Sequence, residues 1–154
     1  MTDAPISLVH ATAVAVSGRG VLILGASGAG KSDLALRLIT TAMVDAGQPV
    51  KIELIADDQV IVERAGDRLF ASAPETIAGQ LEVRGLGIVR IPVLARAEVH
   101  LAVDLVPSER IERLPDAGRT HTILGLHIPL VAIDGEKPGA PARVMLAALE
   151  RVIT

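Results

Sequence analysis

One glycine-rich segment constrains the fold of this chain more strongly than any other feature of its sequence. It lies between a short apolar run, residues 21–24, and a segment with helical spacing that begins at Lys31. Glycines in such a place let consecutive backbone N–H groups turn toward an anion, and the positive end of the following helix points at the same anion. The segment matches the pattern G-x-x-x-x-G-K-[ST] in full, with the residues Gly25, Ala26, Ser27, Gly28, Ala29, Gly30, Lys31 and Ser32.

This match predicts a phosphate-binding loop. In such loops the lysine, here Lys31, adds a positive charge for the β- and γ-phosphates, and the hydroxyl that follows, here Ser32, is a ligand for Mg²⁺. A glycine-rich turn that matches by chance is the alternative, but the strand before the segment and the helix after it are the context that the motif requires. We therefore expect nucleotide phosphates to bind here.

The rest of the chain alternates short apolar runs with helical spacing. We expect an α/β fold, a P-loop-containing kinase domain with a mixed β-sheet and flanking helices, in a single domain over residues 1–154. A Gly turn at residues 65–67 predicts a hairpin, and residues 107–119 have the charges, prolines and glycine of an exposed loop. The expected strands are 11–16, 21–24, 51–56, 60–63, 68–72, 87–94, 98–106 and 129–133, and the expected helices are 31–44 and 142–153.

Composition excludes several classes of function. Lys and Arg total 15 against 18 for Asp and Glu, and there is one Phe with no Tyr or Trp, so neither a basic nucleic-acid surface nor a base-stacking platform is expected. The chain has no Cys, which excludes disulfides and thiolate sites. No apolar run approaches the roughly 20 residues of a membrane span, and residues 1–7 lack the pattern of a signal peptide. We expect a cytoplasmic protein that binds neither nucleic acid nor a membrane.

Two carboxylates are the first candidates for chemistry beside the loop. Asp57 and Asp58 directly follow the apolar run 51–56, and the carboxyl ends of parallel strands meet at one edge of a sheet. One carboxylate there binds Mg²⁺ while another accepts a proton from an attacking hydroxyl. The sequence does not say which of the two is the base. His10 and the loop arginines Arg110, Arg113 and Arg119 are further candidates, although a lone His and an exposed Arg-rich loop are more often structural.

One further segment, Leu81-Glu82-Val83-Arg84-Gly85-Leu86-Gly87, combines charges and glycines within an apolar stretch. It is close to the signature L-E-I-R-G-L-G of the HPr kinase/phosphorylase family. With His10, the glycine-rich loop and the pair Asp57-Asp58 in the family's order, the chain resembles the C-terminal catalytic domain of that family, in the short version associated with alphaproteobacteria. The resemblance runs from about residue 10 to residue 152 and weakens after residue 87.

The resemblance implies a role for each matched residue. Asp57 would take the proton from the acceptor serine and return it in the reverse reaction, with His10 and Lys31 in the active site. Ser32 and Glu82 would be the Mg²⁺ ligands. Arg113 is the best match to the family's catalytic arginine.

The resemblance also implies the reaction. It implies phosphorylation by ATP of a serine in the phosphocarrier protein HPr, and phosphorolysis of the phosphoserine, with phosphate consumed and pyrophosphate released. It implies a homo-oligomer, a hexamer in the family. Pyrophosphate as the donor is left open. A small-metabolite kinase and a catalytically silent nucleotide-binding module are the alternatives that the residues leave open.

Overall fold

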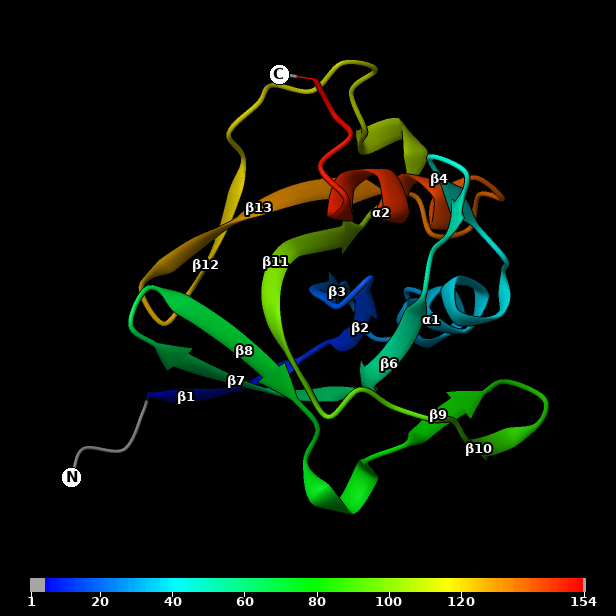
Figure 1. The fold of residues 1–154 in the computed structure, drawn as a ribbon. Coiled ribbons are helices and arrows are strands. Elements are labelled where there is room, and N and C mark those ends of the chain that lie inside the picture. Colours follow the sequence, from blue (N-terminus) through cyan, green and yellow to red (C-terminus); the bar gives the residue numbers. More distant parts are fainter. Residues whose placement is uncertain (1–4, 154) are drawn as a thin grey trace.

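The computed structural model describes residues 5–153, so the beginning of the N-terminal segment considered above, residues 1–4, and residue 154 lie outside the described residues. Its strands and helices alternate along the chain, as the sequence predicts (Figure 1). The strands are β1 Ile6–His10, β2 Thr12–Val16, β3 Arg19–Leu24, β4 Val44–Asp45, β5 Gln48–Pro49, β6 Ile52–Ala56, β7 Gln59–Ala65, β8 Arg68–Ser72, β9 Gln80–Val83, β10 Gly87–Arg90, β11 Arg96–Leu105, β12 Thr120–Ile123 and β13 Leu126–Ile133. The α-helices are α1 Lys31–Thr40 and α2 Ala140–Ala148, and single 3₁₀ turns are η1 Glu75–Ile77 and η2 Ser108–Arg110.

The centre of the molecule is a mixed sheet in the order β6-β2-β3-β11-β13. Strand β2 is antiparallel to both neighbours, β3 and β6, whereas β3, β11 and β13 pair in parallel. Strands β3 and β6 therefore run in the same direction, with β2 between them. Their carboxyl ends meet at one edge, which places the glycine-rich loop after β3 near the Asp57-Asp58 pair after β6.

Strand β11 joins this sheet to a second layer. Its first residues, from Arg96 to Glu98, pair antiparallel with β8, and its later residues pair in parallel with β3. Because β8 forms the predicted hairpin with β7, and β7 pairs with β1, the sheet curls over one face of the central strands (Figure 1). Strand β1 ends at His10 beside Gln59, so this layer carries His10 toward the residues that follow β6.

Two hydrophobic cores lie on opposite faces of the central strands. Alternate residues of β2 divide between them: Val14 and Val16 face the helices, and Ala13 and Ala15 face the curled layer. The helix-side core takes Leu34 and other apolar side chains of α1 and α2. Burial on both faces explains why the central strands are apolar runs without alternation.

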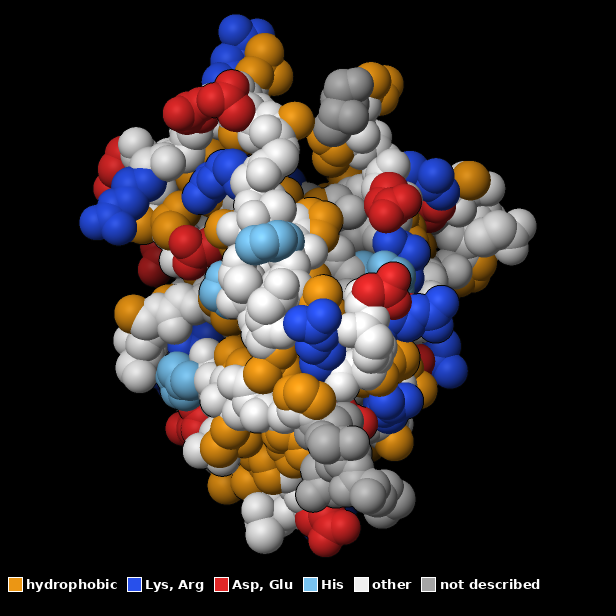
Figure 2. Space-filling view, turned by 90° about the vertical axis from the view of Figure 1, so that its left-hand side faces the viewer, with side chains coloured by type: hydrophobic (Ala, Val, Ile, Leu, Met, Phe, Trp, Pro, Cys, Tyr) orange, Lys and Arg blue, Asp and Glu red, His pale blue; other side chains and the backbone are white. Residues whose placement is uncertain are grey.

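Surface charges are mixed on the face that lies at the left of Figure 1. Figure 2 shows Lys and Arg side chains interspersed there with Asp and Glu, and hydrophobic side chains gathered toward one end. Within residues 5–153, no helix is long and apolar enough to cross a membrane.

The predicted helix 31–44 is too long. Helix α1 ends at Thr40, and residues 44–49 form the small hairpin β4–β5. Its two turn residues, Ala46 and Gly47, both have positive φ, of 50° and 80°, as a tight two-residue hairpin requires. The apolar residues Ala42 and Val44 continue the helical spacing, but this turn chemistry prevails.

The predicted closing helix, 142–153, also extends too far, since α2 ends at Ala148. Glu150 adopts the left-handed conformation at φ 58°, and the Arg151 N–H closes the end by donating to the carbonyl of Leu146. The strand predicted at 87–94 ends at Arg90, and the one predicted at 129–133 begins at Leu126.

Strands β3 and β11 lie too close together at Gly20 for any larger residue to fit there. A Cβ at Gly20 would lie 2.7 Å from the backbone oxygen of Glu98, so neither strand can yield without breaking the ladder. We expect Gly20→Ala to lower the free energy of unfolding by about 1–3 kcal/mol, measured by urea denaturation. Gly135→Ala is the control, because its Cβ would meet only side-chain atoms of Leu105 at 3.3 Å. Equal stabilities of the two variants would contradict this close packing.

Candidate active site

The glycine-rich loop lines a cavity of about 520 Å³ at the carboxyl edge of β3 and β6. Gly28 and Gly30 have φ of 81° and 93°, which side chains rarely adopt, and a Cβ at either would stand in open space. Backbone conformation rather than crowding therefore explains these glycines. Helix α1 begins at Lys31 and directs its N-terminal amides at the cavity. These features fit the oxygens of a nucleotide phosphate chain.

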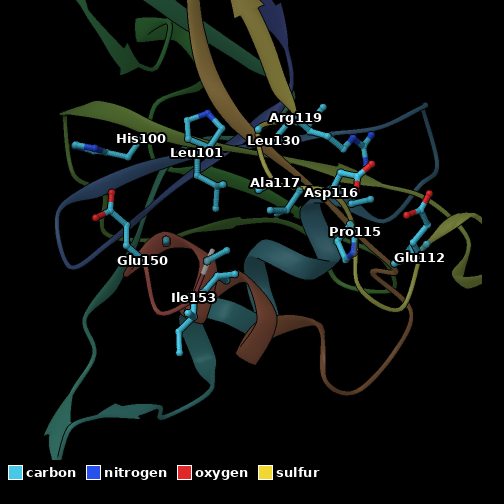
Figure 3. A pocket seen from close by; sticks show the side chains of 18 of the residues that line it. His100, Leu101, Glu112, Pro115, Asp116, Ala117, Arg119, Leu130, Glu150 and Ile153 are labelled. Atoms are coloured by element: carbon cyan, nitrogen blue, oxygen red, sulfur yellow. The ribbon is translucent and has the colours of Figure 1, made fainter.

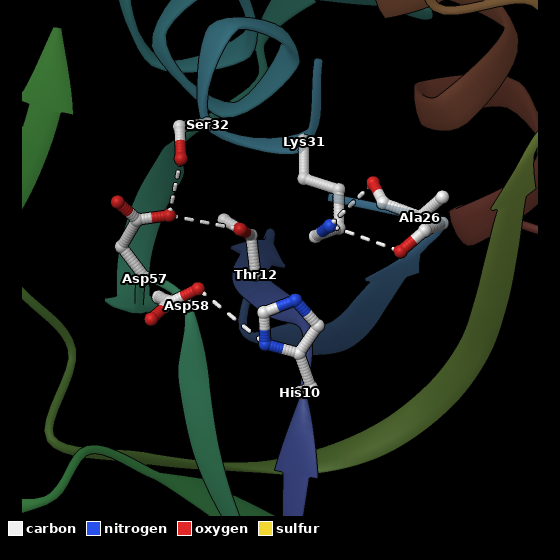
Figure 4. A network of polar contacts seen from close by, with 8 residues as sticks. His10, Thr12, Ala26, Lys31, Ser32, Asp57 and Asp58 are labelled. Carbon is white, nitrogen blue, oxygen red and sulfur yellow. Dashed lines mark hydrogen bonds and ion pairs between the residues drawn. The ribbon is translucent and has the colours of Figure 1, made fainter. Parts of the chain in front are cut away.

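Lys31 is folded back over this loop. Its ammonium Nζ donates to the carbonyl oxygens of Gly25 and Ala26, at 2.9 and 3.0 Å (Figure 4). The side chain is 8% exposed, so its charge is held close to the loop instead of in solvent. Of the residues in the motif, 27–32 line the cavity, whereas Gly25 and Ala26 do not.

Asp57 is the polar centre of the network behind the loop. Its Oδ1 accepts hydrogen bonds from Thr12 Oγ1 at 2.9 Å and from Ser32 Oγ at 2.6 Å, and its Oδ2 accepts one from the Glu82 N–H at 3.2 Å (Figure 4). The residue is 7% exposed. It therefore ties β2, α1 and β9 together and fixes the orientation of the Ser32 hydroxyl.

Asp58 has different surroundings from its neighbour. Its φ of 72° turns the backbone, and its side chain is 70% exposed and lines the cavity. Asp58 Oδ1 lies 3.4 Å from Nδ1 of His10, which lines the same cavity (Figure 4). The structure therefore brings His10 to the phosphate loop and separates the two carboxylates, with Asp57 behind the loop and Asp58 in the cavity.

Glu82 completes one side of the cavity. Its backbone N–H binds Asp57 while its exposed side chain lines the cavity with Val83 and Arg84. Within residues 5–153, no group of three or more His, Cys, Asp and Glu side chains is arranged to hold a metal by itself. The Ser32 hydroxyl and the Glu82 carboxylate, with phosphate oxygens and water, are nevertheless the donor set that Mg²⁺ usually takes, since Mg²⁺ is often bound through one or two carboxylates plus phosphates.

A further part of the cavity wall, residues 135–136, is bonded to helix α1. Gly135 and Glu136 line the cavity, and the Arg37 guanidinium donates to the carbonyl oxygens of Gly135 and Lys137, at 2.5 and 2.6 Å. Asp134 precedes this segment and accepts hydrogen bonds from the hydroxyl of Ser108 and from the N–H groups of Glu136 and Ser108, which together hold the pKa of that carboxyl below its usual range. The wall is thus bonded to two other parts of the fold.

Arg113 is not among the residues that line this cavity. It is exposed, in the stretch between η2 and β12, and neighbours such as Glu112, Asp116 and Arg119 line a separate cavity of about 640 Å³ (Figure 3). That cavity lies beside α2 and the C-terminal residues, where Ile153 is one of its apolar walls. Within one chain, the structure does not bring Arg113 together with the other candidates.

Thr12 is the residue that sequence analysis missed. It is fully buried in the central strand β2, and its hydroxyl donates a hydrogen bond to Asp57. A threonine in an apolar β-strand is ordinary, so no local pattern marks it. The one signal available is a hydroxyl near the start of an apolar run that is expected to be buried, because a buried donor requires an acceptor.

The comparisons with known proteins agree with this geometry. The family model described as HPr Serine kinase C-terminal domain matches residues 3–152. The chain belongs to this family. The resemblance on the signature at residues 81–87 is thereby confirmed, and with it the fold class expected from the sequence, a P-loop kinase fold with a mixed sheet.

Similar proteins bear the name HPr kinase/phosphorylase. That of Limosilactobacillus reuteri is 34% identical over 141 residues, which cover 84% of this chain and 41% of the relative. That of Exiguobacterium sp. is 36% identical over 143 residues, covering 90% and 42%. The chain thus spans less than half the length of these relatives. The solved Hpr(Ser) kinase/phosphatase from Coxiella burnetii superposes with a TM-score of 0.76 at 28% identity, covering 94% of this chain and 95% of that one.

Proposed function

We propose that this chain is a cytoplasmic protein-serine kinase that transfers the γ-phosphoryl group of ATP, with Mg²⁺, to a serine of an HPr-type phosphocarrier protein. The observation that carries the proposal is the pairing of an intact phosphate loop with two carboxylates in different surroundings, one bonded to Ser32 and one facing the cavity. Family membership and the names of the relatives point to the acceptor. We take residues 1–154 to be one catalytic domain.

In this proposal the loop and Lys31 bind the phosphates, and Ser32 and Glu82 hold the Mg²⁺. The ion supplies positive charge that neutralises phosphate oxygens as the transfer proceeds. Asp57 is a positioning residue, because its oxygens already accept three hydrogen bonds and one of these orients the Ser32 hydroxyl.

The base that accepts the serine proton is Asp58 rather than Asp57. A general base must reach the proton that it removes, and Asp58 lines the cavity whereas Asp57 does not. The exposed side chain of Asp58, which contacts His10 only through Oδ1 at 3.4 Å, supports this choice between two carboxylates that the sequence leaves undecided.

The reverse reaction uses the same groups. An oxygen of inorganic phosphate bonds to the phosphorus of phosphoserine, the serine Oγ–P bond breaks, and pyrophosphate forms. The serine oxygen then takes the proton that the base held in the forward direction, as microscopic reversibility requires. The role of Arg113 and the hexamer rest on the resemblance alone, and sedimentation velocity measures the assembly.

Intact-mass spectrometry of HPr incubated with the protein, Mg²⁺ and ATP tests the function. We expect one added phosphoryl group on a serine, and its loss with release of pyrophosphate when inorganic phosphate is added. Lys31→Met is the matched variant that should lose transfer. ATP binding without any phosphorylation of HPr would refute the proposal and favour a metabolite acceptor or a silent module. Replacement of ATP by pyrophosphate tests the alternative donor.

Thr12 provides a test of positioning through Asp57. Thr12→Val removes a buried donor to a charged acceptor while keeping the shape of the side chain. We expect kcat/KM to fall about tenfold, because the free energy of one such hydrogen bond corresponds to a factor of about ten. Thr12→Ser retains the hydroxyl and should restore most of the activity. The same rates in Thr12→Val and Thr12→Ser would show that this hydrogen bond does not matter for transfer.

A further inference from the structure

The hairpin β9–β10 presents two different faces. Leu81 lies opposite Val89 in the register, and these two side chains, with Val83 and Ile91, pack against the helix-side core. The other face, which we call the outer face, carries Gln80, Glu82, Ile88 and Arg90. One face thus anchors the hairpin and the other is free.

The outer face and the turn expose large apolar side chains. Ile88 is 70% exposed and Leu86, in the turn, is 79% exposed. Neither is needed to hold the hairpin in place, since Leu81 is fully buried on the anchoring face. Single exposed apolar residues are common, but here two of them are only two positions apart in a hairpin whose residues 82–84 line the candidate active site.

Register places Ile88 at the rim of the cavity. It lies directly opposite Glu82, whose side chain lines the cavity and whose N–H binds Asp57. Directly opposed residues of an antiparallel pair have Cβ atoms about 4.5–5.5 Å apart on the same face. The apolar surface of Ile88 therefore continues the cavity wall outward.

The hairpin is held rigidly for such a role. The Leu86 N–H donates to the Val83 carbonyl at 3.0 Å, which closes the turn, and Gly85 has the positive φ, 88°, that this turn needs. In Figure 1 the hairpin projects from the body of the molecule on the side of β6. A surface held in place before binding costs less ordering on association.

We propose that Leu86 and Ile88, bordered by Arg84 and Arg90, form the docking surface for the protein that carries the acceptor serine. This inference rests on the proposed function. A serine can reach Asp58 only if the surface of its own protein touches the rim of the cavity. The hairpin β9–β10 forms part of that rim and projects outward from it. The fitting partner surface has apolar side chains beside the serine and acidic groups at its margin, opposite the two arginines.

The experiment measures phosphorylation of HPr at varied HPr concentration by the whole chain and by Leu86→Ser, Ile88→Ser and the double variant. We expect the KM for HPr to rise at least tenfold in the double variant, because burial of one large aliphatic side chain contributes more than a factor of ten to a binding constant. The kcat and the affinity for ATP should change less than twofold. Val44→Ser is the matched control, since Val44 is 60% exposed on another hairpin and does not line the cavity.

A direct measurement of HPr binding distinguishes failure of the docking surface from failure of the proposed function. HPr is also titrated against wild type and double variant with a non-hydrolysable ATP analogue, and each protein is sedimented alone. Transfer by all variants with an unchanged KM would overturn the docking surface and leave the proposed function standing. Binding of HPr that the double variant weakens, without transfer by wild type, would refute the function and retain the surface. A lower sedimenting mass of the double variant would instead assign the hairpin to contacts between copies, and would overturn the proposal.

Discussion

Asp58→Asn is expected to lower kcat for phosphorylation of HPr by about 10²–10⁴, the usual contribution of a positioned general base. The amide has the shape of the carboxylate but cannot take the serine proton. Because the Asp58 side chain is 70% exposed, we expect the free energy of unfolding and the affinity for ATP to stay close to those of wild type. Single-turnover rates with saturating HPr, together with ATP titration and urea denaturation of each variant, check this.

Asp67→Asn is the control for Asp58→Asn, since it makes the same chemical change in the β7–β8 turn, away from the cavity. Unchanged turnover in Asp58→Asn would remove Asp58 from the role of base. Should Asp57→Asn then retain its stability but lose all transfer, the role would return to Asp57.

Asp57→Asn is expected to impair both folding and transfer. One oxygen of the amide can still accept from Thr12 and Ser32, but its NH₂ group would face the Glu82 N–H, at the site where Oδ2 now accepts at 3.2 Å. An unsatisfied buried donor costs about 1–3 kcal/mol, and each kcal/mol lowers Tm by about 2–4 °C in a domain of this size. Scanning calorimetry measures this loss.

Transfer by Asp57→Asn should also require more Mg²⁺, because the hydroxyl of Ser32 is no longer held by a charged acceptor. We expect kcat/KM to fall at least 10²-fold at a Mg²⁺ concentration that saturates wild type, because the Ser32 hydroxyl loses its preorganised position, and to recover in part at higher Mg²⁺. A variant with wild-type Tm and wild-type Mg²⁺ dependence would contradict the positioning role. The two aspartate variants are thus separated by stability and by metal dependence.

Several features of the fold could be predicted because their causes are local. The glycine-rich loop, the start of α1 at Lys31 and the hairpin around residues 65–67 follow from backbone preferences of glycine, from helical spacing and from a tight turn. The apolar runs that form β3 and β6 are typical of strands buried on both faces, as these two strands are. Element ends were less well predicted, since a turn at Ala46-Gly47 and a left-handed residue at Glu150 overrode the periodicity.

What the sequence alone determined is therefore the chemistry that is available: a phosphate loop, a pair of carboxylates, the candidate His10 and the signature at residues 81–87. Only the tertiary structure decided which of these groups share a cavity. Pairing of β1 with β7 carries His10 to Asp58, and the buried hydroxyl of Thr12 meets Asp57 across the β2–β6 pair. Arg113 lies outside the cavity within one chain. Neighbouring aspartates differ because burial and hydrogen-bond partners depend on residues far away in the chain, which spacing along the sequence does not reveal.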